Sequence, residues 1–429
     1  MFENTEKQER ALLLSLDTGE YDAETSLAEL GELTRTAGAD PAFTLIQKRP
    51  APDAATCLGS GMAEEAAELV RREELDLVVF DRELSPTQIR NLEKLCGVRV
   101  IDRTTLILDI FAQRAASREG KLQVELAQLR YLLPRLSGQG TSLSRLGGGI
   151  GTRGPGETKL ETDRRHIRRR INGLREQLRD VEAARDVIEK RRRKNGTVTV
   201  ALVGYTNAGK STLMNRLTQA GVLAEDKLFA TLDPTARALK LPCGKTVMLI
   251  DTVGLIRRLP HHLVEAFKST LEQAATADIL LNICDASSVD AGEHLRVTEE
   301  LLQSLHQGKG AEPAEVSRPV IPVLNKWDAV EDQEFALRIP GAVRISALTG
   351  EGIDDLLQAI EENLPGKTFD VELLLPFSKS GLAARLREEG AVLSEEYVPE
   401  GLRLTARVSD RLYAAVREFD TDPNAHSPA

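Results

Sequence analysis

The stretch Gly204-Tyr-Thr-Asn-Ala-Gly209-Lys210-Ser211-Thr212 decides the fold of this chain. It follows the apolar and β-branched run 197–203, which is typical of a buried strand, and leads into 213–217, whose pattern is helical. Glycines at both ends of the stretch let successive backbone N–H groups turn toward one anion, and the helix N-terminus adds partial positive charge. The stretch therefore predicts a phosphate-binding loop (P-loop), with Lys210 on the β- and γ-phosphates and Ser211 as a ligand of Mg²⁺.

A second motif follows the apolar run 248–250. The residues Asp251-Thr-Val-Gly254 form a D-x-x-G sequence at the carboxyl end of this predicted strand. Asp251 is placed to hold the Mg²⁺ shell, and the Gly254 N–H is placed to meet a γ-phosphate. After a P-loop, this motif favours a nucleoside triphosphate as the ligand.

A third motif, Asn325-Lys-Trp-Asp328, indicates guanine as the base. The Asp328 carboxylate offers two acceptors to the adjacent N–H donors of guanine, which adenine lacks, so such a site should reject adenine strongly. We expect Asn325 to tie the loops together and the Lys326 stem to lie along the base. The run 346–348 ends a further strand, where a backbone N–H is placed to read the guanine O6.

A threonine between the P-loop helix and Asp251 should bind Mg²⁺ only when GTP is present. Such a residue acts as a switch that the γ-phosphate orders and hydrolysis releases. The segment 227–235 holds two candidates, Thr231 and Thr235, and composition does not choose between them.

Charge is unevenly distributed along the chain. The net charge is −10 for 429 residues, yet 111–194 carries 21 Lys and Arg against 10 Asp and Glu. This segment contains a glycine-rich loop at 137–156, between a helical stretch that ends near 136 and a long predicted helix at 157–194. Leu122–Leu133 should pack against the apolar stripe of the long helix, which includes Val187. Arginines crowd its start at 164, 165 and 168–170, and we expect this hairpin to contact RNA or the ribosome.

The remaining sequence predicts α/β architecture on both sides of this hairpin. We expect an N-terminal α/β domain (1–115), the helical hairpin with its glycine-rich basic loop (116–195), a P-loop GTPase domain (196–365) and a small C-terminal α+β domain with its tail (366–429). Strand-like and helix-like runs predict a β-α-β-β-α order for the last domain. Asp81, Asp102 and Asp109 lie near element ends, where helix capping is the expected role.

Composition also indicates the cellular compartment in which we expect the protein. The first ten residues are charged, and no run approaches the ~18 apolar residues that a membrane span requires. The four cysteines are scattered without a C-x-x-C motif, which favours reduced thiols over a zinc site or disulfides. We therefore expect a cytoplasmic protein, monomeric and without a membrane span.

The order of these motifs resembles that of the translation-factor-like GTPases. The run Gly147-Gly-Gly-Ile-Gly-Thr-Arg-Gly-Pro-Gly-Glu-Thr-Lys-Leu-Glu-Thr-Asp-Arg-Arg165 resembles the signature of the HflX family. The resemblance implies a GTPase that binds the large ribosomal subunit, reaches its RNA with the loop of the helical hairpin, and splits stalled or idle 70S ribosomes. It also implies that Thr231 is the switch threonine and, with Ser211, a metal ligand. The alternatives are an RNA-binding regulatory GTPase without splitting activity, an RNA-binding protein with a vestigial nucleotide site, and a metabolic P-loop enzyme, which the N-K-W-D motif opposes.

Catalysis should depend on few side chains. Leu255 stands where Ras-like enzymes orient water with glutamine, so intrinsic hydrolysis should be slow. Asn207 is similar to the asparagine that holds K⁺ in related GTPases, and we expect stimulation by K⁺ or by the ribosome. We expect Lys210, Thr231, Gly254 and Asn207 to be catalytic. The expected contacts with GTP or GDP are Gly204, Tyr205, Thr206, Asn207, Ala208, Gly209, Lys210, Ser211, Thr212, Phe229, Ala230, Thr231, Leu232, Asp233, Asp251, Thr252, Val253, Gly254, Asn325, Lys326, Trp327, Asp328, Ser346, Ala347 and Leu348.

Overall fold

The protein is described here by a computed structural model, and its chain clusters into two compact units. The described residues are 8–136, 155–194, 196–218, 228–229, 231–233, 235–258, 260, 263, 276–307, 319–330, 339–365 and 368–421. The first unit comprises Met1–Ala184, Asp226–Leu232 and Arg258–Phe267. The second comprises Arg185–Glu225, Asp233–Arg257 and Lys268–Ala429. Two short segments of the predicted GTPase domain therefore cluster with the N-terminal part of the chain.

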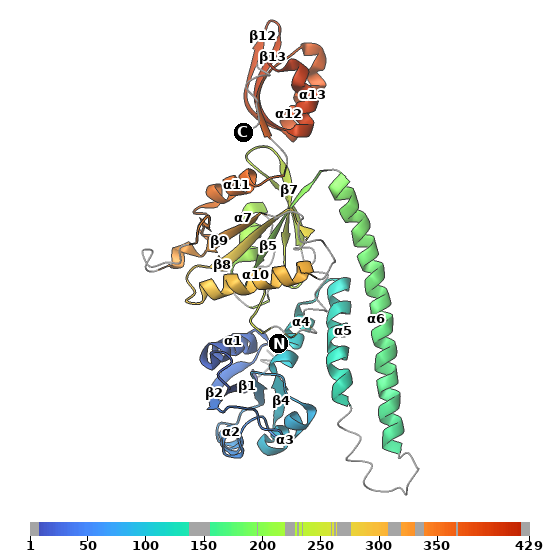
Figure 1. Ribbon diagram of the computed structural model, residues 1–429, viewed down its shortest axis with the longest axis vertical. Coiled ribbons are helices and arrows are strands. Elements are labelled where there is room, and N and C mark those ends of the chain that lie inside the picture. Colours follow the sequence, from blue (N-terminus) through green and yellow to red (C-terminus); the bar gives the residue numbers. More distant parts are fainter. Residues whose placement is uncertain are drawn as a thin grey trace, which may run out of the picture. The chain divides into compact units, whose positions relative to one another are not determined.

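The first unit is built on a parallel four-stranded sheet with the order β2-β1-β3-β4 (Figure 1). Its strands are β1 (Arg10–Asp17), β2 (Asp40–Lys48), β3 (Leu77–Phe80) and β4 (Arg99–Asp102), and its helices are α1 (Ala23–Thr36), α2 (Ser60–Arg72), α3 (Pro86–Cys96) and α4 (Arg103–Arg114). Helices cover both faces of a parallel sheet, so its central strands are apolar almost throughout, and β3 is buried along its whole length. The predicted N-terminal α/β fold is confirmed.

The three aspartates expected to cap helices differ in their roles. Asp102 is the N-cap of α4, and its carboxylate accepts the Thr105 N–H at 2.9 Å. Asp81 caps no described helix: it is fully buried and accepts hydrogen bonds from Ser26 at 2.6 Å and from Arg103 at 2.9 Å. The capping prediction is therefore wrong for Asp81, because its position at a strand end does not reveal which distant donors surround it. It is also wrong for Asp109, which lies in the interior of α4 and not at its start.

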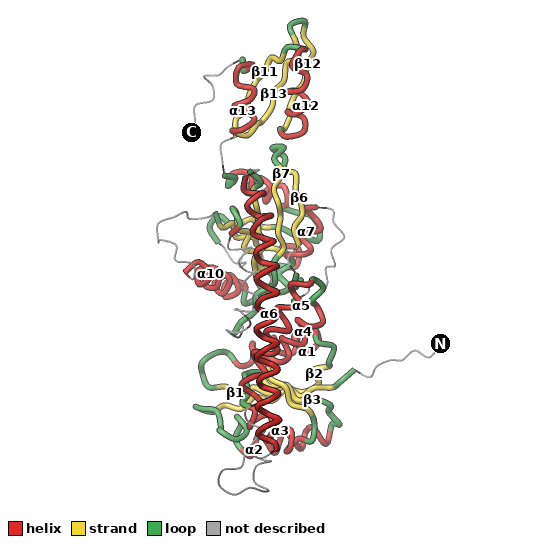
Figure 2. Tube along the Cα trace, turned by 90° about the vertical axis from the view of Figure 1, so that its right-hand side faces the viewer, coloured by secondary structure: helices red, strands yellow, loops and turns green. Residues whose placement is uncertain are grey.

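Two long helices form the predicted hairpin. They are α5 (Arg118–Arg135) and α6 (Pro155–Lys194), which run side by side in Figures 1 and 2. Their seam is apolar, and its buried residues are Leu122, Leu126, Ile171, Leu174 and Leu178. The predicted packing is confirmed in this part of the stripe. Val187 is 53 % exposed and does not continue the seam. Most of the predicted glycine-rich loop lies outside the described residues.

The second unit contains a six-stranded sheet with the order β10-β9-β8-β5-β7-β6. Its strands are β5 (Val198–Gly204), β6 (Thr235–Lys240), β7 (Thr246–Asp251), β8 (Ile279–Asp285), β9 (Val320–Asn325) and β10 (Val343–Arg344). All neighbours pair in parallel except β6 and β7, which pair antiparallel. Because the carboxyl ends of parallel strands meet at one edge, the motifs that follow β5, β7 and β9 converge there.

Helices cover both faces of this sheet. On one face, α7 (Lys210–Thr218) and α11 (Ile353–Glu362) contribute to the main apolar core. On the other face, α10 (Ala291–Gln307) packs against β8, with Leu295 and Cys284 in a shared cluster. The P-loop GTPase fold predicted from the motifs is confirmed.

The chain ends in a small α+β fold with its own core. Strands β11 (Thr368–Leu375), β12 (Ala391–Val398) and β13 (Gly401–Ser409) form an antiparallel sheet of order β11-β13-β12. Helices α12 (Ser380–Glu389) and α13 (Asp410–Val416) complete the predicted β-α-β-β-α order. Apolar residues alternate along β11 and β13, so one face of the sheet packs on the helices.

Two expectations about the chain as a whole can be compared with the described residues. The four cysteines, which were predicted to be reduced thiols, are free and buried. Among the described helices, none combines the length and the apolar character that a membrane crossing demands.

Candidate nucleotide-binding site

The P-loop connects β5 to α7 and depends on glycine where the chain is most confined. Gly209 has a φ of +87°, and a Cβ at this position would lie 2.2 Å from Asn325 Nδ2. Any larger residue would strain the backbone and push against the N-K-x-D motif. Within the loop, Thr206 and Ala208 are buried, whereas Asn207 is half-buried and has a φ of +60°.

The Lys210 side chain is buried inside the P-loop. Its Nζ donates to the carbonyls of Gly204 at 3.1 Å and Tyr205 at 2.8 Å. Burial lowers the pKa of Lys210 to about 8, and the nearby charge of Asp251 opposes this shift. A phosphate would supply a stronger counter-charge at the same place, so the ammonium is poised for an anionic ligand.

A hydroxyl and a carboxylate meet at the start of α7. The Ser211 Oγ donates to Asp251 Oδ2 at 2.8 Å, and Asp251 is fully buried at the end of β7. Oxygen donors of this kind are the ligands that Mg²⁺ prefers, so the side chains present here fit that ion. Ser211 would hold Mg²⁺ directly and Asp251 would support its coordination shell; when bound, the ion would neutralise charge that develops on the phosphates.

The D-x-x-G motif lies directly against the P-loop. A Cβ on Gly254 would approach Thr206 Cα to 2.7 Å, so this position also requires glycine. Thr252 is buried, and its Oγ1 donates to the Leu202 carbonyl at 2.6 Å, which fixes the strand end to β5. Val253 is buried beside it. The position expected to meet a γ-phosphate is thus held by packing on both sides.

Asn325 joins two loops at the carboxyl end of β9. Its Nδ2 donates to the Ala208 carbonyl at 2.8 Å, and its Oδ1 accepts the Ala347 N–H at 2.9 Å. The side chain is 1 % exposed, so these bonds are shielded from water. Asn325 therefore links the P-loop to the loop that begins at Ser346.

The other residues of the N-K-W-D motif are held at the edge of the sheet. Lys326 adopts a φ of +59°, and its Nζ lies 2.7 Å from Asp285 Oδ2 at the end of β8. Trp327 is buried, and the Arg344 guanidinium lies 4.8 Å from its ring centroid. Asp328 is exposed. The arrangement anchors the lysine and the tryptophan and leaves the aspartate at the surface, where a base would meet it.

The loop after β10 is held by a hydrogen bond within the loop and by another from α7. Ser346 is buried, and its Oγ accepts the Thr349 N–H at 3.0 Å. The Leu348 carbonyl accepts Arg216 Nη2 at 3.1 Å, while the Leu348 side chain is 75 % exposed. A helix that starts in the P-loop thus also contacts the loop that is expected to read the base.

The segment expected to carry the switch threonine is divided between the two units: Phe229, Thr231 and Leu232 belong to the first, and Asp233 and Thr235 to the second. Phe229 is buried, and its ring meets Phe111 of α4 edge-on, with centroids 4.7 Å apart. Leu232 is buried, Thr231 and Asp233 are half-buried, and Ala230 lies outside the described residues. Thr235 is the first residue of β6.

Arg258, which the sequence analysis did not single out, belongs to the first unit as well. Its Nη2 donates to Asp81 Oδ2 at 2.8 Å and to the Ser26 hydroxyl, and its guanidinium lies 3.8 Å from the Tyr21 ring centroid. Because Asp81 lies 177 positions away in sequence, no local pattern points to this contact.

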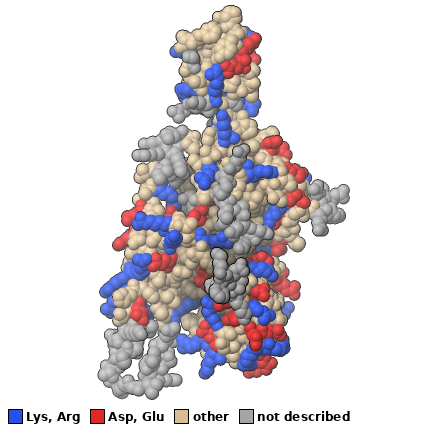
Figure 3. All heavy atoms as spheres, turned by 180° about the vertical axis from the view of Figure 1, so that it is seen from behind, with Lys and Arg blue, Asp and Glu red and all other residues tan. Residues whose placement is uncertain are grey.

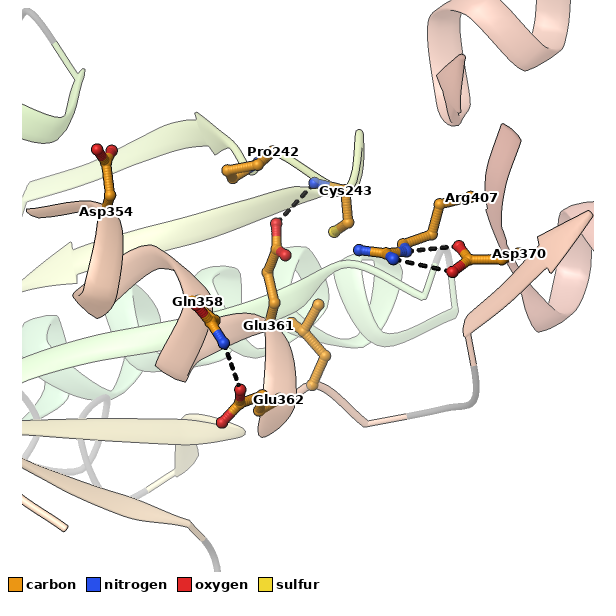
Figure 4. A pocket seen from close by; sticks show the side chains of 9 residues that line it. Pro242, Cys243, Asp354, Gln358, Glu361, Glu362, Asp370 and Arg407 are labelled. Atoms are coloured by element: carbon orange, nitrogen blue, oxygen red, sulfur yellow. Dashed lines mark hydrogen bonds and ion pairs between the residues drawn. The ribbon is translucent and has the colours of Figure 1, made fainter. Parts of the chain in front are cut away.

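A separate hollow of about 670 Å³ lies elsewhere in the second unit (Figure 4). It is bordered by Cys243, α11, β11 and β13, and much of its polar lining is already hydrogen-bonded. Glu361 accepts the Cys243 N–H at 2.6 Å, and Arg407 pairs with Asp370 at 2.6 Å. None of the expected nucleotide contacts lines this hollow.

A P-loop, a D-x-x-G strand end and an N-K-x-D loop on one edge of a six-stranded sheet define a P-loop GTPase. Family models agree and cover successive parts of the chain: "GTP-binding GTPase N-terminal" matches 24–112, "GTP-binding GTPase Middle Region" 114–192, "50S ribosome-binding GTPase" 199–326 and "HflX C-terminal domain" 334–417.

Relatives match over nearly the whole chain. GTPase HflX of Caldanaerobacter subterraneus subsp. tengcongensis is 49 % identical over 98 % of this chain and 95 % of its own length. GTPase HflX of Escherichia coli K12 is 45 % identical over 94 % of this chain and 93 % of its own length. The chain therefore belongs to the HflX family of GTPases.

Proposed function

We propose that this GTPase binds the large ribosomal subunit in a nucleotide-dependent manner and separates stalled or idle 70S ribosomes. The observation that carries the proposal is the basic face of α6. Arg165, Arg168 and Arg169 are exposed on the helix whose opposite face packs on α5. The rear view shows Lys and Arg side chains over several parts of the molecular surface, with acidic residues among them (Figure 3).

The exposed arginines of α6 suit contact with RNA phosphates. Two alternatives are intramolecular pairing and a solvated face, and pairing accounts for Arg170, which contacts Glu125 at 2.6 Å. Arg165, Arg168 and Arg169 project from the same helix, and guanidinium groups bind phosphates through two parallel hydrogen bonds. RNA is often recognised by its shape and its phosphates, for which a long, narrow arm with a cationic face is well suited.

Co-sedimentation with isolated large subunits tests the proposed partner. The wild-type protein should pellet with the subunit when loaded with a non-hydrolysable GTP analogue, and less with GDP. Arg165→Glu combined with Arg168→Glu should reduce pelleting at least about tenfold and flatten its salt dependence, because each phosphate contact releases counterions. Arg71→Glu with Arg72→Glu, an equal charge change on exposed positions of α2, should bind like the wild type. Equal binding by both double variants would refute the role of α6.

Splitting requires its own measurement. Light scattering of 70S ribosomes should fall when the GTP-loaded protein is added, and should not fall with the α6 variant. Nucleotide-dependent binding without loss of scattering would favour the alternative, an RNA-binding regulatory GTPase that does not split ribosomes.

We further propose Mg²⁺ bound by Ser211 and Thr231, and K⁺ held near Asn207. Removal of divalent ions with EDTA should abolish hydrolysis, because the phosphates then lose the charge that neutralises them. Replacement of K⁺ by Na⁺ at constant ionic strength should slow hydrolysis in the wild type and have little effect in Asn207→Ala. Equal rates in both salts would exclude the K⁺ role.

A further inference from the structure

The P-loop and the start of switch II, here residues 254–258, are joined through their backbones. The Leu255 N–H donates to the Gly204 carbonyl at 3.1 Å, and the Thr206 N–H donates to the Leu255 carbonyl at 2.7 Å. Both backbone polar groups of Leu255 are thus used by the P-loop, and the Leu255 side chain is 5 % exposed. The residue in the position of a water-orienting glutamine is fixed by its main chain.

Tyr205 adds a side-chain contact to this pairing. Its hydroxyl oxygen accepts the Arg257 N–H at 2.8 Å, two residues beyond Leu255. The ring of Tyr205 stacks on the His294 imidazole, with centroids 3.8 Å apart and planes inclined by 14°. A tyrosine ring has only two side-chain torsions, so the stack fixes where the hydroxyl lies.

The start of α10 holds this arrangement from the other side. Arg257 Nη2 lies 3.2 Å from Asp290 Oδ2, and the backbone N–H of His294 donates to the backbone carbonyl of Asp290 at 3.0 Å. Asp290 therefore holds the Arg257 side chain while its own backbone supports His294. Tyr205, Arg257, Asp290 and His294 form one cluster, hereafter the Tyr205 clasp, and all four lie in the second unit.

We propose that Tyr205 and His294 are positioning residues for GTP hydrolysis, because the clasp holds the switch II backbone in register with the P-loop. A leucine side chain cannot hydrogen-bond the attacking water, and the backbone polar groups of Leu255 are engaged by the P-loop. Water near the γ-phosphate must therefore be ordered by neighbouring groups of fixed position, such as the backbone of Gly254. A backbone that drifts orders water poorly, and small displacements at a reacting centre are costly. The proposal rests on the GTPase activity of this chain and is independent of ribosome binding.

Single-turnover hydrolysis of bound GTP tests this role, with the affinity for a fluorescent GDP analogue and thermal unfolding measured on the same proteins. Tyr205→Phe keeps the stacked ring and removes the acceptor of the Arg257 N–H. One hydrogen bond of this kind corresponds to about a two- to tenfold slower rate. The affinity for GDP should stay within about twofold, since the P-loop N–H groups are unchanged.

Two variants of His294 test whether its stacking on the Tyr205 ring affects GTP hydrolysis. His294→Phe retains a flat ring against Tyr205 and should hydrolyse GTP at nearly the wild-type rate. His294→Ala removes the stacked ring and should slow hydrolysis, as Tyr205→Phe is expected to do. Tyr397→Phe, the same chemical change at a side chain 70 % exposed on β12, is the matched control and should match the wild type.

Two results would overturn the proposal. One is a wild-type hydrolysis rate in Tyr205→Phe. The other is a parallel fall of hydrolysis, GDP affinity and melting temperature, since a purely structural role predicts that all three change together. A wild-type protein that binds GTP and never hydrolyses it, alone or with ribosomes, would instead refute the GTPase activity itself.

Discussion

Asn325 Nδ2 lies 2.8 Å from the carbonyl oxygen of Ala208, so the residue that begins the N-K-x-D motif also closes the P-loop. The same side chain accepts the Ala347 N–H, and all three residues are buried. The P-loop, the N-K-x-D loop and the loop that begins at Ser346 therefore share one hydrogen-bonding centre.

Asn325→Ala should weaken nucleotide binding without any change in the phosphate contacts themselves. The substitution leaves the Ala208 carbonyl and the Ala347 N–H buried and unsatisfied, at a cost of about 1–3 kcal/mol each. We expect an affinity for GDP at least about tenfold lower and a lower melting temperature. Asn363→Ala removes a local bond of 2.9 Å to Ala359 at the end of α11 and serves as the control. Unchanged GDP binding in Asn325→Ala would contradict this role.

Gly209→Ala should abolish nucleotide binding. The new Cβ would lie 2.2 Å from Asn325 Nδ2, on a backbone with a φ of +87° that L-residues rarely adopt. We expect a GDP affinity too weak to measure by fluorescence titration. Gly173→Ala in α6 has no atom within 4 Å of its new Cβ and should stabilise its helix by about 0.5–1 kcal/mol. Retention of GDP binding by Gly209→Ala would show that the P-loop relaxes more than its contacts suggest.

Asp81→Ala should destabilise the first unit strongly. Its buried carboxylate accepts Ser26, Arg103 and Arg258, so its removal leaves buried positive charge with less compensation. Breaking such a group typically costs about 3–5 kcal/mol, which thermal or urea unfolding should report. Glu64→Gln, at an exposed position of α2, should change stability by less than about 0.5 kcal/mol. A similar small effect in Asp81→Ala would mean that Glu29, the other partner of Arg103, is sufficient.

The stability of the protein should fall on mild acidification, in part through His294. Burial, and then the charge of Arg257, lowers the pKa of His294, while Asp290, Asp285 and Glu293 act in the opposite direction. In the unfolded chain the pKa of His294 is about 6.5. As the pH falls through this value, His294 is protonated in the unfolded state before it is protonated in the folded state, and this stabilises the unfolded state relative to the folded one. Melting temperatures at about pH 7 and about pH 5.5 should differ less in His294→Phe than in the wild type. An identical difference in both proteins would exclude this contribution.

Much of this molecule follows from local sequence patterns. The P-loop, the D-x-x-G strand end and the N-K-x-D loop each combine an apolar strand with a short motif, so their convergence on one sheet edge could be predicted. The strand-like and helix-like runs of the last domain were likewise sufficient to predict the order of its strands and helices. These features are encoded within windows of about ten residues.

Other features depend on partners that are distant in sequence. Asp81 looks like a capping residue until Arg103 and Arg258 are placed around it. His294 lies in an ordinary amphipathic helix, and nothing near it in sequence indicates that it stacks on the P-loop tyrosine. Burial and pairing between such positions arise from tertiary packing, which a single sequence does not specify locally.

The bridge between Leu255 and the P-loop has a consequence for how this position can vary. Because its polar contacts come from the main chain, the side chain contributes only apolar volume. A saturation library at Leu255 should retain Ile, Met and Phe, and should lose Pro, which lacks the N–H that meets Gly204. The side chain at this position is thereby released from selection for hydrogen bonding and constrained by size and hydrophobicity, while the main chain must keep its N–H.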